Sequence, residues 1–384
     1  MTEVVICSVS RTPVGKYRGS LAPFSAVELG IFSVKNLLSR MNIDPSSGII
    51  DEVIFGQVLQ AGAGQAPARQ VAIGAGLPAT TPALTINKVC GSSLKAVMLA
   101  ANAIRSGEYS CIIAGGMESM TNAPKLLIQG QEEAKSSMVH DGLWDVYNDI
   151  HMGNTGEIVS EEYDISRETA DEFALQSQLK ASHAWENGWF DWETFPIELP
   201  DGNILTKDEG IRPHSTLEGL SGLKPVFQEG GRVTAGNAST LNDGASCVLV
   251  TSLSLAKEQG WEPIAYVQDY VTSGVEPSRV MAAPIPAVQN LLKRNKMMVD
   301  DVDVYEHNEA FAAASCAVAK SLQIPSDKLN QHGGAVSIGH PLGSSGTRCL
   351  ITMLGVMKRK GAKTGIVTLC LGGGNAVAML IRSA

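Results

Sequence analysis

A cysteine stands directly before a Gly-Ser-Ser triplet in the segment NKVCGSSLKAVMLAANAIRSGE, residues 87–108. Apolar residues follow at positions 94, 97, 98, 101 and 104, a spacing that predicts one buried face of an α-helix. Ser92 or Ser93 is a suitable N-cap, so Cys90 is expected at the positive end of this helix. Because a helix N-terminus lowers the pKa of a thiol, the pattern predicts a nucleophilic cysteine. The alternative interpretation is a small hydrophobe that happens to precede a helix.

Polar segments interrupt the apolar stretches of the C-terminal half at three places: EHNEAFAAA (306–314), HGGAVSIGHPLGSSG (332–346) and CLGGGNA (370–376). A histidine and a cysteine at turns where strands end, such as His340 and Cys370, suit a site that is built on loops. Either residue taken alone more often has a structural role. The three segments therefore point to catalysis only in combination.

The composition narrows the possible classes of function. The chain has 384 residues, 44% hydrophobic and 18% charged, enough for a large core in two domains or two tightly joined halves. The formal net charge is −9 and no run of Lys or Arg occurs, which disfavours nucleic acid and anionic membranes as partners. No segment approaches the ~18 consecutive apolar residues of a membrane span. The N-terminus indicates a strand rather than a targeting peptide, so we expect a cytoplasmic protein.

The seven cysteines are scattered along the chain without close pairs or the spacing of a metal site. This distribution predicts neither disulfides nor a bound metal. Cys7, Cys111 and Cys247 lie in apolar, strand-like runs and are expected to be buried small hydrophobes.

Short apolar runs alternate with helical patterns, which predicts an α/β fold. Strands are expected at 4–9, 51–58, 111–116 and 245–252, and a helix at 26–41. Residues 117–242 are more polar and contain four of the five tryptophans, which indicates an insertion between two strands of the first half. Residues 91–116 also resemble residues 343–373, because each segment runs from Gly-Ser-Ser through a helix and a buried strand to a glycine pair.

Several long motifs follow one another along the chain and together are more specific than any one of them. They are RTPVGKYRGSL, NKVCGSS, AGGMESM, HMGNTGE, RVTAGNASTLNDGAS, HNEAFA, GGAVSIGHPLGSSG and CLGGG. Over essentially its whole length the chain resembles the thiolase family, and within it the acetyl-CoA acetyltransferases. The resemblance implies a thiolase fold, with two similar α/β halves in a layered αβαβα core. The halves would be residues 1–255, including a loop domain inserted at about 119–240, and residues 256–384.

The resemblance also implies a role for each reactive residue. Cys90 would be the nucleophile that becomes an acyl thioester, and His340 the base that activates it. Cys370 would exchange a proton with C2 of the acetyl group. Asn308 would hold a water that, with His340, binds a thioester oxygen. The backbone N–H groups of Cys90 and Gly372 would form a second oxyanion hole.

By the same resemblance, residues of the insertion and nearby loops would contact coenzyme A or the acyl group. Ser239 matches a pantetheine contact and Arg212 a basic residue near the adenine. The remaining expected substrate contacts are Leu143, His151, Met152, Ala235 and Phe311. Two positions depart from the family pattern: His307, interpreted as a fitted polar residue, and Gly219, where relatives often have a serine that touches the nucleotide.

The implied reaction is the reversible Claisen condensation of two acetyl-CoA to acetoacetyl-CoA plus CoA. No metal or redox cofactor is implied, and a homodimer or homotetramer is expected. Three alternatives stay open: a 3-ketoacyl-CoA thiolase of broader chain length, a ketosynthase-like relative, and a non-catalytic lipid-binding protein on the same fold. The presence of Cys90, His340 and Cys370 together favours the thiolase interpretation.

Overall fold

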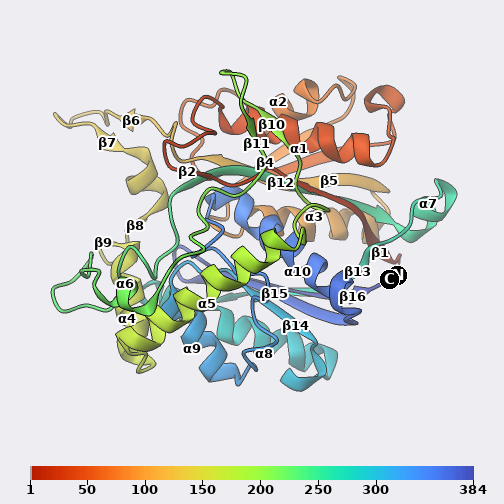
Figure 1. Cartoon of the computed structure of the whole chain (residues 1–384). Coiled ribbons are helices and arrows are strands. Elements are labelled where there is room, and N and C mark those ends of the chain that lie inside the picture. Colours follow the sequence, from red (N-terminus) through yellow and green to blue (C-terminus); the bar gives the residue numbers. More distant parts are fainter. Residues whose placement is uncertain (1) are drawn as a thin grey trace.

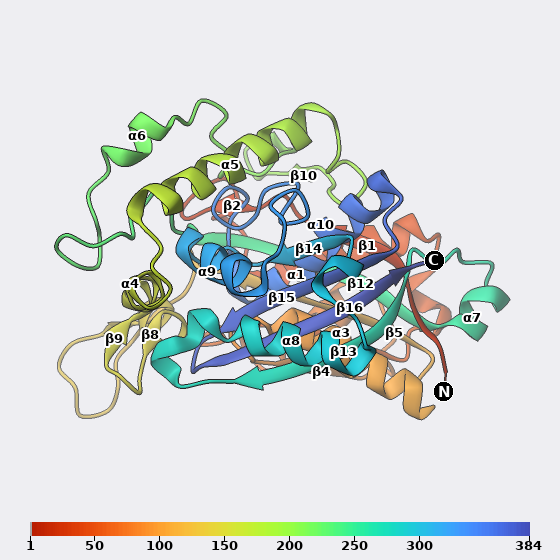
Figure 2. The ribbon, with the colours of Figure 1, turned by 90° about the horizontal axis from the view of Figure 1, so that it is seen from below.

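A single path of hydrogen-bonded strands runs through the computed structural model, which describes residues 2–384 (Figures 1 and 2). Along this path the strands are β14 (Val304–His307), β15 (Thr364–Leu371), β16 (Asn375–Ser383), β13 (Ala265–Gly274), β1 (Val4–Arg11), β12 (Asn242–Ser252), β5 (Cys111–Ser119), β3 (Glu52–Gly56) and β4 (Ala83–Ile86), with β2 (Gly15–Lys16) paired to β12. Only two residue pairs, Val5–Tyr266 and Ile6–Ala265, join β1 to β13. The path is therefore two half-sheets that meet edge to edge.

Helices cover both half-sheets and fill the space between them. They are α1 (Ala26–Arg40) and α2 (Pro67–Gly74) on the first half-sheet, α8 (Pro284–Asn295) and α9 (Ala312–Leu322) on the second, and α3 (Ser92–Ser106) and α10 (Ser345–Lys360) between the two. Three separate apolar clusters match these layers, and the central one joins side chains of α3 and α10 to both half-sheets. The expected αβαβα layering is confirmed.

The two central helices are apolar because they contact protein on nearly every side. All residues of α10 from 345 to 357 are buried, as expected for a helix between two sheets. The apolar face predicted for α3 is buried as well, with Leu94 and Val97 fully excluded from solvent. Cys7, Cys111 and Cys247 are buried as expected.

The predicted start of α3 is wrong in its detail. Gly91 is the N-cap, and no side chain caps the helix. The Ser92 hydroxyl instead accepts a hydrogen bond from Lys88 N at 2.8 Å and donates one to Val89 O at 2.6 Å. The turn that carries Cys90 therefore uses the hydroxyl that was expected to cap the helix.

The inserted segment runs from the end of β5 to the start of β12 and wraps the site side of the core. Its elements are β6 (Lys125–Leu126), β7 (Lys135–Ser136), a π-helical turn (Met138–Gly142), β8 (Trp144–Asp145), β9 (Ile150–His151), α4 (Met152–Glu162), α5 (Arg167–Glu186), β10 (Ile197–Glu198), β11 (Ile204–Leu205) and α6 (Leu217–Ser221). In Figure 1 the β6–β7 arm projects at the left and α5 crosses the front of the core. Fully buried Arg11 of β1 anchors the insertion through Glu193 at 2.6 Å and Asp208 at 2.7 Å.

The short helix α7 (Leu253–Glu258) connects the two halves. The predicted division at residues 255 and 256 falls inside α7 and stays a prediction. The other connections include 3₁₀ turns at Pro45–Ser47, Pro277–Ala282, Val299–Asp301 and Leu342–Ser344. No helix within residues 2–384 is long and apolar enough to cross a membrane.

The first turns of α3 and α10 interlock. The backbone N–H of Thr347 donates to Ser93 Oγ at 2.9 Å. A Cβ atom on Gly346 would lie 2.5 Å from the backbone nitrogen of Leu94. Only glycine therefore allows the two helix starts to approach this closely.

Gly346→Ala is expected to destabilise the protein, because the new methyl group must push α10 away from α3. Forced overpacking of this kind costs about 1–3 kcal/mol or more, and thermal unfolding should report it as a lower Tm. Gly222→Ala is the matched control, since its Cβ would meet no atom closer than 3.6 Å. Equal Tm values for the two variants would contradict the proposed close contact.

Candidate active site

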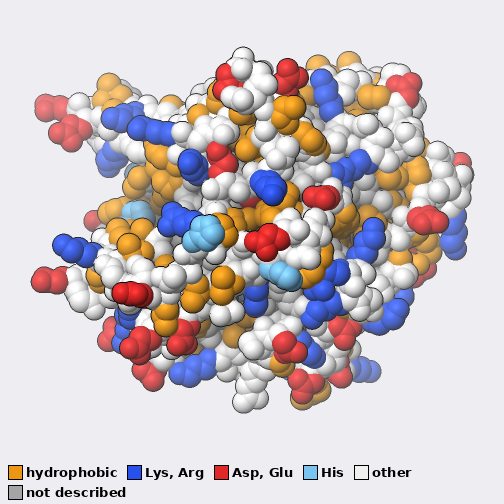
Figure 3. Space-filling model, viewed as in Figure 1, with side chains coloured by type: hydrophobic (Ala, Val, Ile, Leu, Met, Phe, Trp, Pro, Cys, Tyr) orange, Lys and Arg blue, Asp and Glu red, His pale blue; other side chains and the backbone are white. Residues whose placement is uncertain are grey.

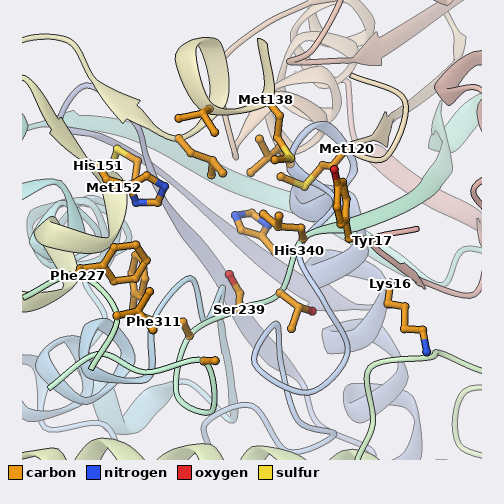
Figure 4. A pocket seen from close by; sticks show the side chains of 18 of the residues that line it. Lys16, Tyr17, Met120, Met138, His151, Met152, Phe227, Ser239, Phe311 and His340 are labelled. Carbon is orange, nitrogen blue, oxygen red and sulfur yellow. The ribbon is translucent and has the colours of Figure 1, made fainter. Parts of the chain in front are cut away.

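Two connected cavities lead into the core from the side of the inserted segment. The outer one has a volume of about 570 Å³ and the inner one about 60 Å³. The residues that line both cavities are Leu143, Met152, Ser239, Phe311, His340 and Leu342. Figure 3 shows the surface notched at the left, between the β6–β7 arm and the loops around α6, and Figure 4 shows His340 and Ser239 facing the outer cavity.

The inner cavity brings together the reactive residues that the sequence predicts. Cys90 lies just before α3, His340 in the loop before α10, and Cys370 near the end of β15. All three side chains line the inner cavity together with Gly372. Two thiols and an imidazole thus face the same small space, although they come from distant parts of the chain.

Burial, rather than the helix start, controls the protonation of the Cys90 thiol. Desolvation raises the pKa of Cys90 to about 12, although the backbone N–H groups of Cys90 and Gly372 oppose the shift. The predicted lowering of this pKa is therefore wrong. Burial also raises the pKa of Cys370 and lowers the pKa of His340 to about 3, with the Arg348 charge lowering it further. The site therefore holds neutral thiols beside a neutral imidazole.

A hydrogen bond fixes the tautomer of His340. Its Nδ1 lies 2.5 Å from Ser345 Oγ, and that hydroxyl donates to Pro341 O at 2.9 Å. Ser345 therefore accepts the Nδ1–H, which leaves the lone pair of Nε2 free to take a proton. The backbone N–H of His340 donates to Asn242 Oδ1 at 2.8 Å, which holds the loop in place.

Asn308 lies behind His340 rather than in the cavity wall. It is fully buried, and its Nδ2 is 3.3 Å from His340 Nε2. The neighbouring His307 has its Nδ1 2.7 Å from Ser315 Oγ, and it does not line either cavity. This contact agrees with the interpretation of His307 as a fitted polar residue.

The predicted substrate contacts fall into three groups. Leu143, Met152, Ser239 and Phe311 belong to the group that lines both cavities. His151 and Ala235 line only the outer cavity, where the His151 ring stacks on Phe227 with 4.8 Å between centroids. Arg212 and Gly219 are both exposed, and neither lines a cavity. The contact predicted between Arg212 and the nucleotide stays a prediction.

Three supporting residues were not singled out from the sequence: Glu118, Asn242 and Ser345. Glu118 is fully buried and accepts hydrogen bonds from the backbone of Val58, Leu59 and Gly343. Burial raises its pKa to about 7. A carboxylate within the apolar strand CIIAGGMES was the available signal, since buried charges are retained only where they have partners.

The neutral thiol and base suit a reaction in which the thiol loses its proton only as it attacks a carbonyl group. The fold and the site together thus suit an enzyme that transfers acyl groups.

Comparison with known proteins agrees with this class. Residues 4–254 match the family described as “Thiolase, N-terminal domain” and residues 261–383 match “Thiolase, C-terminal domain”. The whole chain is 49% identical, over 393 aligned residues and the full length of both proteins, to an acetyl-CoA acetyltransferase from Cupriavidus necator. It is 46% and 45% identical, over 99% of both chains, to probable acetyl-CoA acyltransferases from Staphylococcus aureus and Staphylococcus epidermidis. The chain belongs to the thiolase family, and it is an acyltransferase.

Alkylation of Cys90 by iodoacetamide should accelerate with rising pH. Because its pKa is about 12, the thiolate fraction should grow about tenfold per unit between about pH 7 and pH 10. Peptide mapping after brief labelling measures this rate. Cys316 is the internal reference, because Cys90 and Cys316 are the two cysteines within residues 2–384 that are not fully buried. A plateau already reached near neutral pH would indicate a thiolate–imidazolium pair and contradict the neutral site.

Proposed function

We propose that the protein is an acetyl-CoA C-acetyltransferase that condenses two acetyl-CoA to acetoacetyl-CoA plus CoA, reversibly, through an acyl-enzyme on Cys90. The observation that carries this proposal is that Cys90, His340 and Cys370 share one cavity of about 60 Å³. Acyl transfer needs only one thiol and a base. The second thiol in the same space supports an additional proton transfer at carbon.

In the first step the Cys90 sulfur attacks the thioester carbon of acetyl-CoA. Its proton passes to Nε2 of His340, and the departing CoA sulfur takes that proton to leave as a thiol. The negative charge that forms on the carbonyl oxygen is stabilised by the backbone N–H groups of Cys90 and Gly372. This oxyanion hole agrees with the effect of both N–H groups on the Cys90 pKa.

In the second step Cys370 passes its thiol proton to Nε2 of His340 and then, as the thiolate, removes a proton from C2 of a second acetyl-CoA. The resulting carbanion attacks the acyl carbon, and the bond to Cys90 sulfur breaks. Negative charge on the second thioester oxygen is stabilised by the Nε2–H of the protonated His340 and by a water held by the Asn308 amide, whose Nδ2 lies 3.3 Å from His340 Nε2. The departing Cys90 sulfur takes the proton from His340, and Cys370 keeps the proton from C2, so both thiols and the imidazole end neutral and no further reactant is needed.

The two cavities differ in a way that supports a short acyl group on a long carrier. The outer cavity of about 570 Å³ has a mostly apolar lining with a few polar groups such as Ser239 and Lys16, which suits the pantetheine arm of CoA. The inner cavity is about 60 Å³, and Met152, Leu143 and Met281 narrow it. We therefore propose acetyl-CoA, acetoacetyl-CoA and CoA as the substrates, and a homodimer or homotetramer as the assembly.

The chain-length preference is tested by thiolysis of a series of 3-ketoacyl-CoA substrates. We expect kcat/KM to fall steadily beyond acetoacetyl-CoA, because each added methylene must displace the walls of the inner cavity. One methylene is worth only about 1–3 kcal/mol of discrimination, so the whole series decides. Equal kcat/KM for acetoacetyl-CoA and a ketodecanoyl-CoA would instead favour a thiolase of broad chain length.

The two proposed half-reactions should separate in Cys370→Ala. This variant keeps the nucleophile, its base and the first oxyanion hole, so it should still exchange acetyl groups between acetyl-CoA and labelled CoA. Condensation and thiolysis should fall by about 10²–10⁴, the usual contribution of a positioned acid or base. Cys90→Ala is the matched control and should lose both activities, because no acyl-enzyme can form.

Circular dichroism checks the folding of both variants. Condensation by Cys370→Ala at a near wild-type rate would indicate that Cys370 is a buried structural thiol, and it would favour the ketosynthase-like alternative. Loss of acetyl exchange in this variant, with folding intact, would contradict the separate roles of the two thiols.

A further inference from the structure

A buried arginine contacts the back of the proposed site. Arg348 lies in the first turns of α10, and its side chain is 1% exposed. Its Nη2 is 3.5 Å from Asn308 Oδ1 and 3.0 Å from Cys349 Sγ, and its Nη1 is 3.4 Å from Glu306 Oε1. A buried charge is costly unless its contacts serve a purpose, so this side chain requires an explanation.

The ion pair with Glu306 does not provide a sufficient one. Strong arginine–carboxylate pairs are frequently bidentate, and a buried pair repays its desolvation only when additional hydrogen bonds satisfy both groups. Here a single contact joins the two groups, and within residues 2–384 neither Arg348 Nε nor Glu306 Oε2 has a hydrogen-bond partner. Burial also raises the pKa of Glu306 to about 8, although the Arg348 charge opposes the shift. The pair is therefore far from an optimised structural salt bridge.

The position of Glu306 explains how Arg348 reaches the site. Glu306 belongs to β14, and Asn308 follows two residues later, just beyond the end of the strand. Side chains two residues apart in an extended chain point to the same side, and α10 packs against β14. Arg348 of α10 can therefore contact both side chains at once, with Glu306 as its counter-charge.

The contact with Asn308 has a direction because arginine can only donate hydrogen bonds. The two ends of an amide are chemically opposite, one accepting and one donating. With the Arg348 guanidinium at one end, that end must be Oδ1, and Cys349 Sγ lies 3.6 Å from the same oxygen. The NH₂ end then faces His340 Nε2, at 3.3 Å.

We propose that Arg348 is a positioning residue that fixes the orientation of the Asn308 amide, so that its NH₂ group is presented on the His340 side of the site. The inference rests on the proposed function, in which that side stabilises the negative charge of the second acetyl-CoA. An amide turned by 180° would place Oδ1 against the lone pair of Nε2 and turn the NH₂ group away from the water that it holds for the oxyanion. Arg348 prevents this turn without contacting substrate.

The two half-reactions distinguish a positioning role of Arg348 from a merely structural one, because loss of a structural contact should lower both activities alike. Acetyl exchange uses the N–H groups of Cys90 and Gly372, whereas condensation also needs the Asn308 amide. Arg348→Met should therefore lower condensation and thiolysis about 10²-fold or more, the cost of losing one oxyanion donor. Acetyl exchange should change less than about tenfold, because its donors are backbone groups.

Arg348→Lys is the second variant and keeps a donor-only cation beside Glu306. It should lose less condensation activity than Arg348→Met, and it keeps the proposal testable if the methionine variant does not fold. Arg40→Met is the matched control, because Arg40 is a partly buried arginine that donates to the backbone of Val9 and Thr194. It should leave the ratio of condensation to exchange unchanged.

A double-mutant cycle with Asn308→Ala is the decisive measurement. If Arg348 acts through the amide, adding Arg348→Met or Arg348→Lys to Asn308→Ala should cause no further loss of condensation. A further loss as large as in the wild-type background, or an equal fall of exchange and condensation in the single variants, would overturn the proposal. A wild-type enzyme that exchanges no acetyl group would instead refute the proposed function itself.

Discussion

The interlocked first turns of α3 and α10 are the constraint on which the site depends. Gly346 places no side chain of its own between the two helices, and the N–H of Thr347 donates to Ser93 Oγ at 2.9 Å. Cys90 comes just before one helix and His340 just before the other. Because the two helix starts cannot separate without breaking this contact, a cysteine and a histidine 250 residues apart in sequence face one cavity.

Burial in the central layer determines the chemistry of that cavity. It holds Cys90 as a thiol and His340 as a neutral base, so no permanent charge has to be stabilised before substrate arrives. Burial also makes hydrogen-bond partners for the polar groups of the catalytic loops important. Ser345 accepts a hydrogen bond from His340 Nδ1, and Asn242 accepts one from the His340 backbone N–H. Glu118 accepts hydrogen bonds from three backbone N–H groups where the two halves meet.

The inserted segment contributes most of the wall that a long substrate would touch, and one buried arginine ties it to the core. Arg11 contacts Glu193 and Asp208, all with side chains that are fully excluded from solvent. Such a triad is a weak source of net stability, because the cost of desolvation offsets much of the attraction. Its geometry is specific, however, and it fixes the position of the insertion against β1.

The sequence by itself determined the α/β class, the inserted segment and the buried face of α3, and it predicted Cys90, His340 and Cys370 as the reactive side chains. These features follow from local periodicity and from long motifs, which a linear chain records directly. Only the tertiary structure decided that Gly91 caps α3, that the Cys90 pKa is raised, and that Arg348 faces Asn308. Desolvation and hydrogen bonding depend on which distant segments close around a group, and no local pattern contains that information.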